Sequence, residues 1–234
     1  MRRAAGACVG AAIVAALLAG GPALAAGEPW TSWSAEHAER VGRAAYVRGR
    51  VGGLFDTRLF KTERSYNYKL AATWLTPEVI RATARLLQLR QRLSDPEALR
   101  LVDQAEAAAP TSVLVEIDPR EGSGVVPLDW VAILQFAGGV EIRGTLSPAL
   151  RDVPSLAGVL RRNYDYDRFW VAFPLLDERG QSLVPEGAVH ATLKVRIYDH
   201  EGRVEWPMSP SVVERARRLE AQRPADGQAS PLVP

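Results

Sequence analysis

The most chemically distinctive stretch of this sequence is a short run in which tyrosine and aspartate alternate. Tyr164, Asp165, Tyr166 and Asp167 follow two arginines and an asparagine. Aromatic rings offer a flat apolar surface to sugar C–H groups, and carboxylates accept hydrogen bonds from hydroxyls. The run is therefore compatible with a glycan- or peptide-binding loop on a rigid scaffold. The competing interpretation is a solvated loop whose tyrosine rings are half-buried against the protein.

Carboxylate side chains also support an enzymatic alternative. Two carboxyl groups about 5–10 Å apart across a cleft would supply the acid and base of a glycosidase. Calcium binding would instead need about six to eight oxygen ligands, which two aspartates spaced two residues apart do not supply. A secreted carboxylate-dependent hydrolase is therefore the alternative to a binding function. Its candidate carboxylates are Glu116, Asp118, Glu121, Asp165 and Asp167.

The histidines, serines and glycines form no recognisable catalytic, metal or nucleotide motif. His37, His190 and His200 lack the spacing of a zinc-binding motif, so we predict no metal and no cofactor. Ser123 lies between two glycines but lacks the strand and helix that flank a hydrolase nucleophile. A triad assembled in space from distant residues leaves no trace in sequence order. The glycine-rich segments are followed by strand-like sequence, whereas a phosphate-binding loop leads into a helix.

A stripe of arginines lies on one face of a predicted helix. Arg81, Arg85, Gln88 and Arg92 are spaced i, i+4, i+7 and i+11, which places them on one side of the helix. Such a stripe could contact an anionic envelope surface or a partner. It could equally be the solvated side of an amphipathic helix. The three arginines join the tyrosine and aspartate run as candidate binding residues.

The helix that carries these arginines is the first of a predicted αα-hairpin. Thr76 is a favourable N-cap, and Pro77 suits the first helical position. Ser94 and Glu97 have the spacing of a capping box, which begins the second helix. Apolar residues recur at helical spacing in both segments. The sequence therefore predicts a helical hairpin over residues 77–108.

Alternating apolar and polar residues predict strands before and after the hairpin, and a nearly continuous apolar run over residues 130–136 predicts a strand that is covered on both faces. A glycine-interrupted strand is expected over residues 45–55, after a short helix over residues 35–42. The strand at 65–74 is expected to be half-buried, and in the strand at 188–198 every second residue from Val189 onward is expected to face the core. The strand-like segments are 65–74, 112–118, 130–136, 140–146, 168–176, 188–198 and 203–206.

These elements together predict a mainly β (α+β) protein. Many short strands that do not alternate with helices favour an antiparallel β-sandwich over a nucleotide-binding βαβ fold. The sandwich domain is expected to span residues 28–208, with the αα-hairpin inserted in it. Ser211 and Glu214 repeat the capping-box spacing and predict a short C-terminal helix over residues 209–222. Residues 223–234 are rich in Pro, Ala, Gly and Ser and are expected to be a disordered tail.

Residues 1–25 have the pattern of a secretory signal peptide. Two arginines precede an uncharged apolar segment, and Ala23-Leu24-Ala25 matches the small-x-small pattern of a cleavage site. The apolar segment consists mostly of Ala and Gly, which is less typical of a membrane-spanning anchor. The sequence therefore predicts cleavage near Ala25, a periplasmic or secreted product, and no stable membrane span afterwards.

Cleavage would change the chemistry of the exported chain. The chain has 29 basic and 27 acidic residues, and removing Arg2 and Arg3 leaves equal numbers of each. A neutral product weakens the case for a nucleic-acid partner, since such partners require a basic surface. Cys8 is the single cysteine, so the product has no thiol and no disulfide. We therefore expect an exported, non-enzymatic protein that binds an envelope protein or glycan.

Overall fold

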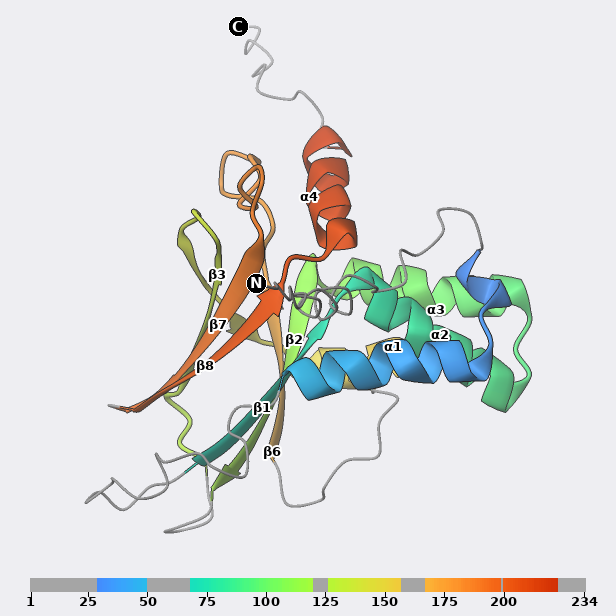
Figure 1. Ribbon diagram of the computed structural model, residues 1–234, viewed down its shortest axis with the longest axis horizontal. Helices are drawn as coiled ribbons and strands as arrows, with labels where there is room; N and C mark the ends of the chain where they lie inside the picture. Colours follow the sequence, from blue (N-terminus) through green and yellow to red (C-terminus); the bar gives the residue numbers. More distant parts are fainter. Residues whose placement is uncertain (1–28, 50–67, 120–125, 157–166, 199, 223–234) are drawn as a thin grey trace, which may run out of the picture.

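The computed structural model describes residues 29–49, 68–119, 126–156, 167–198 and 200–222 (Figure 1). The predicted signal peptide, the predicted tail and residues 164–166 lie outside this part of the chain. The helices are α1 (Ala35–Arg48), α2 (Pro77–Gln91), α3 (Asp95–Ala108) and α4 (Pro210–Gln222). The strands are β1 (Tyr68–Leu75), β2 (Thr111–Pro119), β3 (Val131–Phe136), β4 (Glu141–Arg143), β5 (Thr145–Leu146), β6 (Asp167–Phe173), β7 (His190–Ile197) and β8 (His200–Pro207). Short 3-10 helices cover Trp30–Ser32, Pro148–Asp152 and Pro154–Leu156.

The strands form two antiparallel four-stranded sheets. The first sheet has the order β1-β2-β6-β5, and the second has the order β4-β3-β7-β8. The described part of the chain is therefore mixed α and β, and the expectation of a mainly β protein is wrong because helices contain more of its residues than strands do. Part of the difference comes from α1, which is longer than predicted and occupies residues where a strand was expected.

One hydrophobic cluster contains residues from both sheets. Trp74 in β1 packs against Phe136 in β3 and Trp206 in β8, with ring centroids 6.3 Å and 5.6 Å apart. Trp130 and Phe169 form a second aromatic pair, 4.9 Å between centroids. These three aromatic contacts belong to a buried group that also includes alternate residues of β2, β6 and β7. Apolar side chains at every second position of the strands thus meet in one core.

Helices cover the other face of the first sheet. Leu114 of β2 and Trp170 of β6 belong to a second buried cluster with Ile80 of α2 and Val102 of α3. Figure 1 shows α1, α2 and α3 on one side of β1 and β2, with the second sheet on the other side. The expectation that the strand over residues 65–74 is half-buried is therefore wrong, since Ala71 and Thr73 are buried as well as Trp74.

The predicted αα-hairpin is confirmed as α2 and α3, which connect the neighbouring strands β1 and β2. The capping box at the start of α3 is also confirmed, since the Ser94 backbone N–H donates to the Glu97 carboxylate at 2.7 Å. The cap predicted at Ser211 is wrong. Helix α4 begins at Pro210, and the Val213 N–H donates to the Ser209 carbonyl at 3.3 Å. Proline at the first helical position explains the earlier start.

Helix α1 extends six residues past its predicted end at residue 42 and occupies 45–48, where a strand was expected. The strand prediction is wrong there because Val41 and Ala45 pack into the buried cluster of α2 and α3, which favours continued helix. Gly49 ends α1 against β1, where its carbonyl accepts the Ala72 N–H at 2.8 Å. A Cβ on Gly49 would lie 1.4 Å from the Ala72 carbonyl oxygen, so only glycine permits this approach.

The segment predicted as one strand over residues 140–146 is divided between the two sheets. Strand β4 pairs with β3, and β5 pairs with β6. Gly144 lies at the crossing, where a Cβ would be 2.3 Å from Val171 Cγ1, so a side chain would keep the chain from passing this close to β6. The turn before β4 contains Gly138 in the left-handed region, at φ 77°. Val189 is 71% exposed because β7 begins one residue later, which corrects its predicted inward direction.

Candidate functional site

The structure describes one residue of the tyrosine and aspartate run. Asp167 is the first residue of β6 and is exposed. Tyr164, Asp165 and Tyr166 lie outside the described residues. The binding loop therefore stays a prediction. Its last carboxylate, that of Asp167, lies at the start of β6 in the first sheet.

The candidate carboxylates of the hydrolase alternative lie on opposite faces of the first sheet. Glu116 is 3% exposed, and the Arg168 Nε lies 3.5 Å from its carboxylate. Asp118, two residues further along β2, shares that face. Asp167 is on the other face, because it neighbours Arg168 in β6 and Arg168 pairs with Glu116. Glu121 and Asp165 lie outside the described residues, so no two of the described carboxylates on different strands share one cleft.

The arginine stripe is partly covered by the N-terminal segment of the described chain. The Arg85 Nε donates to the Trp33 carbonyl at 2.7 Å, and its Nη1 donates to Gln88 Oε1 at 2.7 Å. Gln88 is 4% exposed and donates to Asp95 Oδ1 at 2.7 Å. The interpretation of the stripe as a wholly solvated helix face is therefore wrong at Gln88.

The two ends of the stripe have different surroundings. Arg81 is half-buried, whereas Arg92 is exposed and terminates α2 in the left-handed conformation at φ 56°. Trp30 and Trp33, which precede α1, pack against the buried clusters of the helices. This arrangement uses Arg85 to hold the tryptophan segment on α2 and leaves Arg92 as the exposed member of the three arginines.

A surface that the sequence analysis did not single out is the outward face of the second sheet. We call it the polar sheet face. Its residues alternate with the core residues of the same strands, such as Leu193 and Val195 in β7. It consists of Val131, Ile133, Gln135, Glu141, Arg143, His190, Thr192, Lys194, Arg196, Glu201, Arg203, Glu205 and Pro207.

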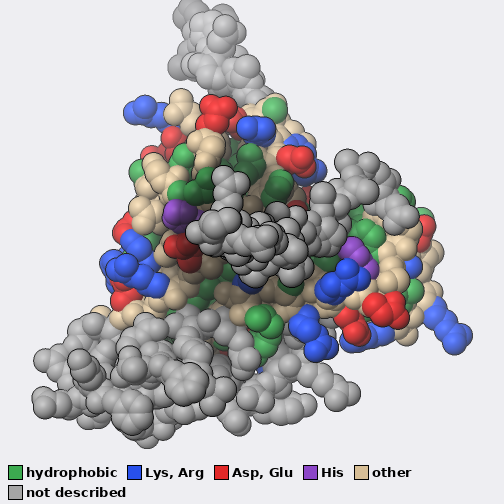
Figure 2. Space-filling view, in the orientation of Figure 1, with side chains coloured by type: hydrophobic (Ala, Val, Ile, Leu, Met, Phe, Trp, Pro, Cys, Tyr) green, Lys and Arg blue, Asp and Glu red, His purple; other side chains and the backbone are tan. Residues whose placement is uncertain are grey.

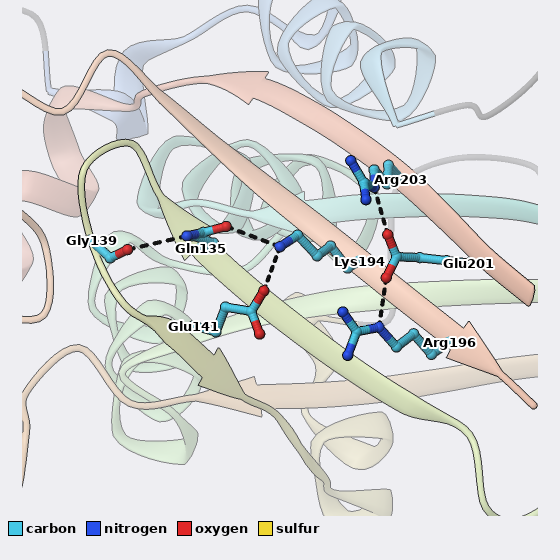
Figure 3. Close-up of polar contacts among 7 residues, drawn as sticks. All are labelled: Gln135, Gly139, Glu141, Lys194, Arg196, Glu201 and Arg203. Carbon is cyan, nitrogen blue, oxygen red and sulfur yellow. Dashed lines mark hydrogen bonds and ion pairs between the residues drawn. The ribbon is translucent and has the colours of Figure 1, made fainter. Parts of the chain in front are cut away.

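Two groups of polar contacts organise this face, as Figure 3 shows. Lys194 Nζ donates to Glu141 Oε1 at 2.5 Å and to Gln135 Oε1 at 3.1 Å. Gln135 in turn donates to the Gly139 carbonyl at 3.2 Å. These contacts connect β7 across β3 to β4 and the turn before it. Lys194 is held in one position by two acceptors, so its charge is fixed on the sheet.

Glu201 forms the second group, between two arginines. Arg196 Nε donates to Glu201 Oε2 at 2.6 Å, and Arg203 Nε donates to Glu201 Oε1 at 2.5 Å. Arg196 faces Glu201 directly in the β7–β8 register. Hydrogen bonds from Arg196 first, and then from Arg203, lower the pKa of Glu201. Similarly, the hydrogen bond from Lys194 lowers the pKa of Glu141.

Replacing Arg196 with glutamine should raise the pKa of Glu201 toward the ordinary glutamate value of 4.5. In the wild type, a lowered carboxylate pKa adds stability that is fully present above the ordinary pKa and is lost as pH falls through the lowered value. The R196Q variant should lose part of that acid-dependent contribution. The pKa is measured by NMR titration of the glutamate side-chain carbons. R143Q is the control, and an unchanged Glu201 pKa in R196Q would contradict the ion-pair geometry.

The described part of the chain offers no metal site and no helix that could cross a membrane. No group of three or more His, Cys, Asp or Glu side chains in it could hold a metal ion. None of its helices is long and apolar enough to span a bilayer. On the side of the molecule seen in Figure 2, basic and acidic side chains are interspersed.

The sequence contained a partial signal for this face. The alternation in residues 188–198 predicted that His190, Thr192, Lys194 and Arg196 face away from the core. Their acidic partners, however, are on other strands, and the pairing becomes apparent only when the strand register is known.

Comparisons with known proteins leave the chain without an assigned relative. No protein-family model matches it, and no curated protein or solved structure matches it significantly.

Proposed function

We propose that this chain is an exported, non-enzymatic protein whose polar sheet face binds a partner protein in the cell envelope or outside the cell. The signal-peptide pattern of residues 1–25 supports export. We also propose a sandwich arrangement for the two sheets. The two sheets pack as a β-sandwich, an assignment supported by the hydrophobic cluster to which both contribute.

The observation that carries the binding proposal is the ordered arrangement of charges on the polar sheet face. Lys194 and Glu201 each contact two neighbours, and the strands beneath them are anchored by fully buried residues such as Leu134 and Leu193. Side chains that are already ordered lose less conformational entropy when a partner binds. Charges of both signs in fixed positions favour one partner with a complementary pattern over others.

The composition of this face favours a protein over a glycan or a nucleic acid. The residues that define it include no Phe, Tyr or Trp, whereas glycan recognition would use stacking on such rings. Its acidic and basic residues are nearly balanced, whereas a nucleic-acid surface requires an excess of basic charge. Glycan binding remains tied to the predicted loop of Tyr164, Asp165, Tyr166 and Asp167, which would be a second contact surface.

The hydrolase alternative receives less support from the described residues. Glu116 is paired with Arg168, and Asp167 projects from the opposite face of the same sheet. A glycosidase mechanism needs two carboxyl groups facing one substrate.

The proposal is tested by capturing envelope and secreted proteins on the immobilised chain lacking residues 1–25. The test variant is R143E/R196E, which reverses two charges on the polar sheet face. The control is R90E/R217E, which makes the same change in net charge at exposed positions of α2 and α4. A protein captured by the wild type and the control but lost with R143E/R196E would support the proposal. Capture that is equal on all three proteins would refute it, with circular dichroism confirming that each is folded.

Export is tested separately. The full chain is expressed in a bacterial host, and the mass of the product in the periplasmic and extracellular fractions is determined. Cleavage after Ala25 is the expected result, and retention of the whole chain in the cytoplasm would contradict it.

A further inference from the structure

The second sheet ends in a long edge strand. Strand β8 is the last in the order β4-β3-β7-β8, and within the described residues it pairs with β7 alone. It spans eight residues, His200–Pro207. The edge of the first sheet differs, because the end of α1 reaches β1 through the bond between the Gly49 carbonyl and the Ala72 N–H. An uncovered edge strand is a template for pairing with another strand.

The register shows which backbone groups of β8 face this edge. The Met208 N–H donates to the Val189 carbonyl at 2.9 Å, one position beyond the pair His190–Pro207. Hydrogen-bonded pairs alternate along an antiparallel ladder, so Trp206, Val204 and Gly202 direct their backbone groups toward β7. The backbone groups directed toward the open edge are those of Glu201, Arg203 and Glu205.

The charges on these residues are most fully complementary in the antiparallel register centred on Val204. If Val204 lies opposite Val204 of a second copy, Arg203 of each copy lies opposite Glu205 of the other. Centring the pair on Arg203 would instead oppose two arginines and place Glu201 opposite Glu205. Centring it on Gly202 would place Arg203 opposite Glu201 but would leave Glu205 beyond the strand of the other copy. Opposite charges on facing strands are favourable and like charges are unfavourable.

We propose that two copies of this chain associate through β8 in the register centred on Val204, so that their second sheets form one continuous antiparallel sheet. Each Arg203–Glu205 pair exchanges two backbone hydrogen bonds, and the Glu201 N–H donates to the Pro207 carbonyl of the other copy. Pro207 has no N–H to donate, and this register places it at the end of the ladder, where the loss is smallest. The arrangement is isologous, as a two-fold dimer requires.

The side chains of the edge are placed for this contact. The Arg203 side chain is 69% exposed, and its guanidinium keeps further N–H donors beside the one used by Glu201. Glu205 is exposed and makes no hydrogen bond or ion pair within the described residues. Charged residues and proline usually prevent edge strands from pairing. In the register centred on Val204, Arg203 and Glu205 face opposite charges, and Pro207 lies at the end of the ladder. These residues therefore favour this register over the others.

The proposal is tested on the purified chain lacking residues 1–25 by sedimentation velocity across a concentration series. The wild type should show a reversible monomer–dimer equilibrium. R203E and E205R should each weaken dimerisation about tenfold or more, because each opposes like charges at two symmetric positions. The double variant R203E/E205R should recover an affinity within about threefold of the wild type. R217E, on the exposed side of α4, is the charge control and should leave the dimer unchanged.

A proline variant checks the backbone contact, and E205Q is its control because both substitutions remove the charge of Glu205. E205P removes an N–H directed to the open edge and none from the β7 ladder, so the fold should be retained while dimerisation is lost. A wild type that stays monomeric at all concentrations overturns the proposal. A dimer whose affinity is unchanged by both R203E and E205P would also overturn the proposal. If R203E/E205R does not recover the dimerisation affinity, the register centred on Val204 is wrong. The assay contains no other protein, so its outcome is independent of whether the polar sheet face binds a partner.

Discussion

Replacing Arg215 with alanine should lower the free energy of unfolding by about 2–4 kcal/mol, because it leaves a partly buried carboxylate and two backbone carbonyls without their charged donor. Arg215 is 5% exposed, and its Nη1 lies 3.0 Å from Glu106 Oε2. Its Nη2 donates to the carbonyls of Glu106 and of Ala109, the latter at 3.0 Å. Alanine would leave the carboxylate and both carbonyls at the end of α3 without this donor. Urea denaturation followed by circular dichroism measures the change.

Arg215 is the principal polar attachment of α4 to the helical hairpin. Burial lowers the pKa of its guanidinium, and Glu106 opposes that effect. Its Nε is buried without a hydrogen-bond partner, so the residue bears a desolvation cost that only its other contacts offset. The matched control is R217A, because Arg217 is an exposed residue of the same helix, and its effect should stay within about 0.5 kcal/mol. An equal effect of both substitutions would mean that α4 does not dock through Arg215.

Elements defined by short-range signals could be predicted from the sequence. Thr76-Pro77 and the Ser94–Glu97 capping box lie within a few residues of the helix starts that they determine, and both starts are present. Alternation located the strands for the same reason, since period two is a local pattern. Val171 and Phe173 in β6, for example, are buried as the pattern predicts.

Features that depend on contacts between distant residues could not be predicted in this way. The length of α1 depends on its packing against α2, and the fit of Gly49 depends on β1. The segment around Gly144 has one continuous alternating pattern, yet its two halves pair with different sheets. A local pattern records which residues are apolar and does not record which strand they will pair with.

In the candidate site, too, local sequence predicted some features, and contacts between distant residues determine the others. The sequence indicated that Lys194 and Arg196 face outward, but their contacts with Glu141 and Glu201 follow from strand pairing. Conversely, Gln88 had the spacing of an exposed helix face and is buried, because Arg85 and Asp95 enclose its amide in hydrogen bonds. Polar residues become recognisable as a surface or as a buried network only once their tertiary neighbours are known.

Replacing Trp74 with alanine should lower the free energy of unfolding by about 3–5 kcal/mol, since it removes a large side chain from a filled core. Trp74 is 2% exposed, and its indole N–H donates to Thr111 Oγ1 at 2.9 Å. The W74F variant keeps an aromatic ring and loses that hydrogen bond, so its cost should be smaller. Denaturant unfolding measures both variants, and a cost of W74A near that of an exposed residue would contradict the burial of this ring.

A double-mutant cycle extends this measurement to the packing of the two sheets. Trp74 belongs to the first sheet, and Trp206, whose ring centroid is 5.6 Å away, belongs to the second. If the sheets pack face to face, W74A and W206A should be non-additive, with a coupling energy of about 0.5–3 kcal/mol. W74A and L150A should be additive within about 0.5 kcal/mol, because Leu150 is buried in the separate cluster between the first sheet and the helices. Additivity in both cycles would mean that the two sheets do not pack against each other through these tryptophans, and would contradict the sandwich assignment. Coupling confined to the tryptophan pair would establish that the sheets share one core in solution.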